Sequence, residues 1–198
     1  MAHEDLWLQL DKLDRQRTAQ RAKCQYLADP PRYVVTLLNT EYVVNLTDRQ
    51  IFSAQTGQEP APAEFLEQLC ILAYLINAQD LPPAGKFVGP EHLPTGQFFF
   101  RGLHSLPTGK LEEAFGKSPE RLYEVSKKFD AKRTEFGDAS IELYALPRIP
   151  LTIIIWRGDD EFDARASILF DQTAGSQLPL DAIGALANLT VKALVVCK

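Results

Sequence analysis

The sequence predicts a single α+β domain in which helices pack against a mixed, mainly antiparallel sheet. The chain has 198 residues, 45% of them hydrophobic, which is enough to bury one sizeable core. Two groups of short β-branched runs predict strands. Longer segments with apolar residues every three or four positions predict helices between and after those groups. We therefore expect one domain over residues 1–198, with an amphipathic N-terminal helix in residues 1–30 and an α+β core in residues 31–198.

The first predicted element is an amphipathic helix over residues 6–27. Leu6, Leu10 and Leu13 recur at helical spacing. Asp29-Pro30-Pro31 ends the helix, because the residue before a proline avoids the helical region. The Lys/Arg-rich second half of the helix is either a solvated face or a docking surface for a partner protein.

Three strands and a helix are predicted in the first half of the core. The strands are expected at residues 33–38, 42–46 and 50–54, joined by short turns as an antiparallel meander. A helix over residues 62–77 follows, with its large apolar residues on one face. Cys70 widens that face, so we interpret its thiol as a small core hydrophobe.

Residues 84–108 are the most unusual stretch of the chain. Proline and glycine recur throughout it, which predicts an ordered loop with one short strand near residues 98–101. The stretch holds His92 and His104, two of the three histidines, and the run from Phe98 to Arg101. Loops of this length in compact domains are usually functional, so we place the candidate site here.

The rest of the core is predicted to contain three helices and three strands. Helices are expected at residues 111–115, from Ser118 to about 132, and at 178–196. Strands are expected at residues 140–146 and 151–156, with a rigid connector at 147–150. Residues 164–170 are expected to form the third strand or a short buried segment. The uniformly apolar strand 151–156 should be central and covered on both faces. The pattern leaves open whether the two strand groups share one sheet.

Composition and charge narrow the classes of function. A net charge of −5 argues against a general nucleic-acid binder, which needs a basic face. The acidic N-terminus does not resemble a secretory signal, and the apolar runs are too short to span a bilayer. Cys24, Cys70 and Cys197 are far apart, so neither a disulfide framework nor an iron–sulfur cluster is expected. We expect a cytoplasmic protein.

Two polar residues of the loop are candidates for chemistry. His104 is either the axial ligand of a tetrapyrrole or a partner in a hydrogen-bonded turn. Arg101 either holds a carboxylate or phosphate, or pairs with the acidic residues 159–163. Phe98 and Phe100 are either core side chains or the apolar wall of a cofactor pocket.

The acidic run Asp159-Asp160-Glu161 permits two interpretations. Its oxygens could bind a hard cation, or the run is a solvated turn, since it lacks the alternating oxygen pattern of a calcium loop. No glycine-rich nucleotide loop, Walker loop or nucleophile elbow is present in the sequence, and the catalytic residues therefore stay unknown.

Several motifs together resemble a known family. They are Phe99-Phe100-Arg101-Gly102-Leu103-His104, Leu146-Pro147-Arg148-Ile149-Pro150-Leu151, Trp156-x-Gly158-Asp159-x-Glu161-Phe162 and Leu178-Pro179-Leu180-Asp181. The chain is similar to the domain-of-unknown-function family 3786 of anaerobic bacteria and archaea. The resemblance implies a setting among corrinoid and one-carbon enzymes, and it adds Arg148, Asp171 and Asp181 to the positions of interest.

Three functions follow as hypotheses. The first is a non-catalytic binding or accessory protein for a corrinoid or other tetrapyrrole, with Phe98 and Phe100 as wall, Arg101 and Arg148 on carboxylates and His104 as axial ligand. The second is a metal-assisted enzyme that uses His104 and two acidic residues, Asp159 and Asp171. The third is an interaction module whose N-terminal helix docks on a redox or methyl-transfer protein, so that deleting residues 1–28 leaves a folded core.

Overall fold

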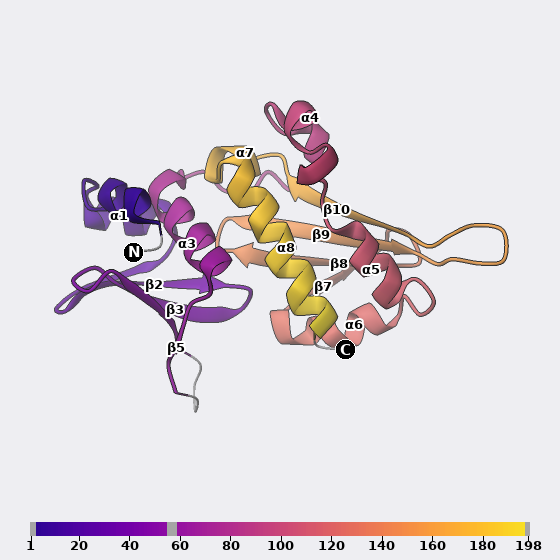
Figure 1. Ribbon diagram of the computed structural model, residues 1–198, viewed down its shortest axis with the longest axis horizontal. Coiled ribbons are helices and arrows are strands. Elements are labelled where there is room, and N and C mark those ends of the chain that lie inside the picture. Colours follow the sequence, from indigo (N-terminus) through magenta and orange to yellow (C-terminus); the bar gives the residue numbers. More distant parts are fainter. Residues whose placement is uncertain (1–2, 55–58, 197–198) are drawn as a thin grey trace.

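Two antiparallel sheets stand side by side in the computed structural model, which describes residues 3–54 and 59–196 (Figure 1). Each sheet has five strands. Every strand pairing in the described residues is antiparallel, so the sheets are not mixed. The protein is α+β, as the sequence predicts, and the two strand groups form separate sheets.

The first sheet is the predicted meander, extended at both edges. Its strands follow one another in chain order: β1 (Gln25–Ala28), β2 (Pro31–Leu37), β3 (Thr40–Asn45), β4 (Gln50–Ser53) and β5 (Ala61–Pro62). Tyr33, Val35 and Leu37 alternate into the core along β2, as expected of a sheet with one buried face.

The second sheet has the order β6-β10-β9-β8-β7. Its strands are β6 (Phe87–Val88), β7 (Lys132–Thr134), β8 (Ala139–Leu146), β9 (Ile149–Trp156) and β10 (Arg165–Asp171). Seven of the eight residues of β9 are buried, which confirms the predicted central strand. The expected connector at 147–150 is shorter than predicted, because Ile149 and Pro150 already belong to β9.

Two long helices join the sheets. α3 (Phe65–Asn77) lies beside the first sheet and α8 (Leu180–Val196) covers the second, and the two helices pack against each other (Figure 1). The thiol of Cys70 on α3 is fully buried and lies 3.7 Å from the carbonyl oxygen of Ala182 on α8, which confirms that it is a core residue.

Shorter helices complete the described structure. They are α1 (Glu4–Leu10), α2 (Arg15–Arg21), η1 (Pro90–His92), α4 (Gly96–Phe99), η2 (Gly102–His104), α5 (Thr108–Phe115), α6 (Arg121–Ser126), η3 (Lys127–Phe129) and α7 (Ala174–Gln177). The helix expected from Ser118 to about 132 is therefore broken into α6 and η3. It ends at Asp130, whose φ of 52° lies in the left-handed region.

The N-terminal prediction is wrong in extent. Residues 6–27 form α1, α2 and part of β1 instead of one helix. Asp14 divides the helices, because its carboxylate accepts the backbone N–H of Arg17 and so caps the start of α2. Lys23, with φ of 49°, turns the chain into β1.

This N-terminal region belongs to the core. Trp7 is 0% exposed and Leu10 is 2% exposed. The hydroxyl of Tyr74 on α3 donates to the carbonyl of Ala22 at 2.9 Å. Deletion of residues 1–28 is therefore expected to disrupt the core, contrary to the expectation from the sequence.

Replacing Trp7 by Ala should lower the free energy of unfolding by about 3–5 kcal/mol, because it leaves a large cavity between α1 and α3. Leu8→Ala is the matched control, since Leu8 is 44% exposed on the same helix, and it should cost less than about 1 kcal/mol. Urea denaturation followed by fluorescence and circular dichroism measures both changes. A chain lacking residues 1–28 that still unfolds cooperatively would contradict this account.

Candidate functional site

The predicted functional loop forms a projection that we call the crest, residues 89–107. It contains η1, α4 and η2 and stands away from the β6 edge of the second sheet (Figure 1). The expected strand at 98–101 is wrong, since Gly96 to Phe99 are helical. The backbone N–H of Phe100 donates to the carbonyl of Gly96 at 3.0 Å and closes this turn.

The crest is held by a close backbone approach and by apolar anchors. A Cβ atom on Gly96 would lie 2.0 Å from the carbonyl oxygen of Pro90, so only glycine fits there. Leu93 is 3% exposed, and the ring of Phe100 stacks on Phe170 of β10 with centroids 6.5 Å apart. Phe100 is therefore a structural anchor between crest and sheet.

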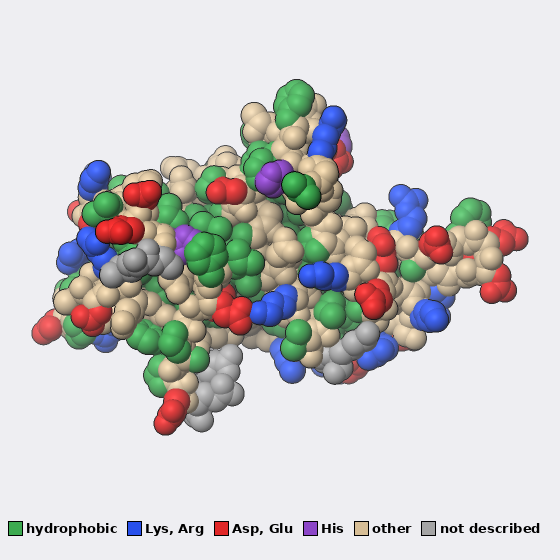
Figure 2. Space-filling view, viewed as in Figure 1, with side chains coloured by type: hydrophobic (Ala, Val, Ile, Leu, Met, Phe, Trp, Pro, Cys, Tyr) green, Lys and Arg blue, Asp and Glu red, His purple; other side chains and the backbone are tan. Residues whose placement is uncertain are grey.

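The outer side of the crest exposes large apolar groups. Phe98 is 75% exposed and Leu103 is fully exposed. Arg101 and His104 are exposed beside them, and the imidazole of His104 lies 4.7 Å from the ring of Phe99. Hydrophobic, basic and histidine side chains gather on this projection in Figure 2. The structure thus brings Phe98, Arg101 and His104 together on a surface, not around a cavity.

Asp171 fastens the base of the crest. Its carboxylate accepts hydrogen bonds from the backbone N–H groups of Ala84 and Gly85, and from both the backbone and the hydroxyl of Thr173. Burial works to raise the pKa of Asp171, but these hydrogen bonds together outweigh it and hold the pKa below its ordinary value. Both oxygens are thus engaged by the chain itself.

Arg148 lies elsewhere and has a structural role. It sits in the tight turn between β8 and β9 and is 9% exposed. Its guanidinium donates to the backbone carbonyls of Gln20 and Arg21 and pairs with Asp80. Arg148 thus ties α2 to the second sheet and does not converge with Arg101.

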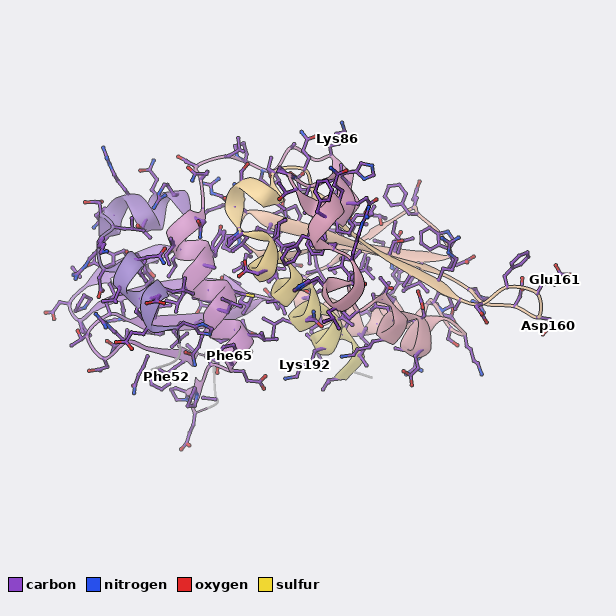
Figure 3. All side chains as sticks on the ribbon, turned by 45° about the horizontal axis from the view of Figure 1, so that its top comes forward. Phe52, Phe65, Lys86, Asp160, Glu161 and Lys192 are labelled. Carbon is purple, nitrogen blue, oxygen red and sulfur yellow. The ribbon has the colours of Figure 1, made fainter. Side chains whose placement is uncertain are left out.

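The acidic run is a turn at the end of a long hairpin loop. The carboxylate of Asp159 accepts the backbone N–H groups of Glu161 and Phe162, and these bonds lower its pKa. Figure 3 shows Asp160 and Glu161 at the loop tip, far from Lys86 at the base of the crest. Among residues 3–54 and 59–196, no group of three or more His, Cys, Asp or Glu side chains could hold a metal ion.

Two of the hollows on the described surface are lined by residues of interest. One of about 300 Å³ separates the crest from β10. The other, of about 750 Å³, lies between the β2–β3 hairpin, η3 and the C-terminal part of α8. In the larger hollow the hydroxyl of Tyr42 donates to Glu67 at 2.7 Å, and burial followed by this carboxylate raises the pKa of Tyr42. Phe98 and Phe100 were expected as possible walls of a pocket, and Phe100 lines the smaller hollow whereas Phe98 does not. The larger hollow was not expected from the sequence, because it is lined by segments far apart in the chain.

The fold and the site define an α+β protein with a projection that exposes large apolar side chains. A family described as a domain of unknown function, DUF3786, matches residues 14–193. The chain belongs to this family. The match begins at Asp14, the residue that caps α2, so α1 lies outside it.

The other comparisons give no relative. Neither the curated proteins nor the solved structures contain a match to this chain. Within the described residues, the helices fall short of the length and apolar character that a bilayer crossing requires.

Asp171→Asn is expected to lower the free energy of unfolding at pH 7 by about 2–3 kcal/mol. The side-chain amide would turn an N–H₂ group toward a backbone N–H that the carboxylate now accepts. Because the folded pKa of Asp171 is lowered, its stabilisation is fully present above the unfolded pKa of about 3.9 and is lost as the pH falls through the folded value.

Urea denaturation at neutral and acidic pH tests this expectation. The difference between wild type and Asp171→Asn should shrink as the pH falls below the unfolded pKa. Asp163→Asn, which changes an exposed carboxyl in the β9–β10 loop, is the control and should have little effect at either pH. A difference that stays constant across this range would show that the charge of Asp171 does not stabilise the fold.

Proposed function

We propose that this protein is a non-catalytic binding or accessory protein of the cytoplasm, and that its crest docks on a partner protein. The observation that carries the proposal is the exposure of Phe98 and Leu103 on a braced projection. Large apolar side chains that point outward from an anchored element are typical of the central residues of protein interfaces.

Binding a partner would bury apolar surface that the fold leaves exposed on the crest, and the free energy gained by this burial favours a binding role. Burying each of Phe98 and Leu103 in a partner's pocket contributes about 1.5–3 kcal/mol. Phe100 and Leu93 already hold the crest in place, so little additional order is needed on binding. Arg101 and His104 would lie at the rim of this contact, where they favour a partner whose apolar pocket is edged by carboxylates or carbonyl oxygens.

The partner classes to test first are redox and methyl-transfer proteins, which the family resemblance implies. The docking element differs from the N-terminal helix expected from the sequence. Trp7 and Leu10 of α1 face the core, whereas the apolar residues of the crest face solvent. The proposed contact surface is therefore the crest and not α1.

A photo-crosslinking amino acid at position 98 should yield one discrete crosslinked species in the cells that make the protein. The same amino acid at position 162 is the matched control, because Phe162 is 71% exposed in the β9–β10 loop. Equal crosslinking from both positions would indicate non-specific contact.

Once a partner is isolated, the double variant Phe98→Ala/Leu103→Ala should bind it roughly 100-fold more weakly, corresponding to about 3 kcal/mol. Phe162→Ala should bind like the wild type. Titration calorimetry measures the affinities, and an unchanged affinity of the double variant would remove the crest from the interface.

A corrinoid or other tetrapyrrole is the second candidate ligand, supported by the setting of His104. Its exposed imidazole has no hydrogen bond to another described residue and lies against Phe99. A macrocycle resting on the crest would meet His104 as axial ligand, Phe98 as apolar contact and Arg101 as carboxylate partner. Phe100 and Arg148 are engaged in the fold, so they drop out of the proposed ligand contacts.

Titration with aquocobalamin or haem tests this second candidate. A saturable shift of the visible band is expected with the wild type and should disappear in His104→Ala. His92→Ala is the matched control in the same crest, since the ring of His92 lies 3.0 Å from Glu91. A band shift that survives in His104→Ala would show that His104 is not the ligand.

A further inference from the structure

The outer edge of β10 is only partly covered. β6 pairs with β10 at Phe170 and Asp171, and this register would place residue 90 opposite Ile168. That residue is Pro90, which has no backbone N–H and whose carbonyl accepts from Leu93. The ladder therefore ends after β6 and leaves the edge of β10 open at residues 166–168.

The hydrogen bonds that are made show which backbone groups face this edge. The N–H of Ala166 donates to a carboxylate oxygen of Glu112 on α5, and the N–H of Gln172 donates to the carbonyl of Lys86. Both acceptors lie on the β6 side. Backbone groups alternate along a strand, so the N–H and C=O of Ile168 point the same way.

Ile168 presents these groups in an unusual environment. The residue is 2% exposed, and within the described part of the chain its outward N–H and C=O have no protein partner. Shielded backbone groups of this kind are nearly always hydrogen-bonded in folded proteins. Ile168 also helps to line the hollow of about 300 Å³ between β10 and the crest, on the side to which these groups point.

We propose that the open edge of β10 at residues 166–168 accepts a short extended peptide as an additional strand. The peptide would donate to and accept from Ile168 and donate to the carbonyl of Ala166. These groups span about 7 Å of strand, at roughly 3.3 Å per residue, so about three peptide residues can pair. The site is separate from the outer side of the crest and does not require the crest to bind a partner.

The walls of the hollow indicate the chemistry of the peptide. Phe100 and Leu106 supply apolar surface, and the carboxylate of Glu91 stands on the crest side. A peptide with one apolar residue next to a lysine or arginine fits this lining. The crest and α5 both contact β10 beside this edge, so a flexible segment can enter where the rigid sheet edge of a second copy would meet these walls.

The probe is the blocked peptide acetyl-Thr-Val-Lys-Val-Thr-amide, added to the full ¹⁵N-labelled chain. Saturable changes in the amide shift of Ile168 and slower hydrogen exchange of this amide are expected. Two analogues, N-methylated on the central lysine or on the adjacent valine, test strand pairing. One should bind at least roughly tenfold more weakly and the other like the parent, because alternate N–H groups of a strand face its neighbour.

Two serine variants test the location. Ser105→Trp places a large ring at the hollow and should abolish the shift of Ile168. Ser176→Trp changes an exposed serine on α7 and should leave the shift of Ile168 unchanged.

Absence of a saturable shift at Ile168, equal effects of the two methyl groups, or full binding by Ser105→Trp would each overturn the proposal. So would a shift that depends on protein concentration without peptide, which would assign the edge to self-association. Phe98→Ala/Leu103→Ala should leave peptide binding intact, which separates this inference from the proposed function.

Discussion

The packing of α3 against α8 is the interaction on which the rest of the structure depends. Ile71, Leu72 and Leu75 of α3 are all 0% exposed. They are buried because α3 lies between the first sheet, α1 and α8. Ala182 of α8 lies against α3, with its carbonyl oxygen 3.7 Å from the thiol of Cys70, and its small side chain leaves room for the helices to approach closely. Each large buried side chain contributes about 1.5–3 kcal/mol to the free energy of unfolding. The α3–α8 interface therefore stabilises the fold more than any single surface contact does.

A second junction fixes how the two sheets are oriented. The turn between β2 and β3 uses Leu38 and Asn39, with φ of 48° and 60°, and Leu38 is costly in this left-handed region. This conformation lets the backbone N–H of Leu38 donate to the carbonyl of Ala145, at the register shift in β8. The side-chain amide of Asn39 donates to the carbonyl of Lys128. The turn residue that is locally unfavourable is thus the one that joins the sheets.

The same balance between local cost and tertiary gain shapes the crest. Thr95 begins α4 with a φ of 61°, which is unfavourable for a β-branched residue. Phe98 and Leu103 give up the stabilisation that burial would provide. Such costs tend to persist where a segment has a use beyond stability. The interior side of the crest, in contrast, is ordinary core packing through Leu93 and Phe100.

The sequence by itself determined which segments are strands and long helices wherever one pattern dominated. The apolar run of β9, the alternation in β8 and the helical spacing of α3 each specify their element through burial of one face or of both. It also singled out residues 84–108, where recurring proline and glycine keep the regular elements short: β6 has two residues, and η1, α4 and η2 have three or four each. The apolar pattern did not separate two short elements that follow one another. Residues 6–27 were expected to form one helix, which Asp14 in fact divides.

Only the tertiary structure decided what the candidate residues do. From the sequence, Arg101 and Arg148 were equally good candidates to bind a carboxylate. In the structure, Arg148 is buried against the carbonyls of α2, whereas Arg101 is exposed on the crest. The open edge at Ile168 was equally invisible, because it depends on the register that brings Pro90 opposite that residue. Patterns along the chain report whether a side chain prefers to be buried. Which partner it meets depends on contacts between distant segments, and these exist only once α3 and α8 have brought the two sheets together.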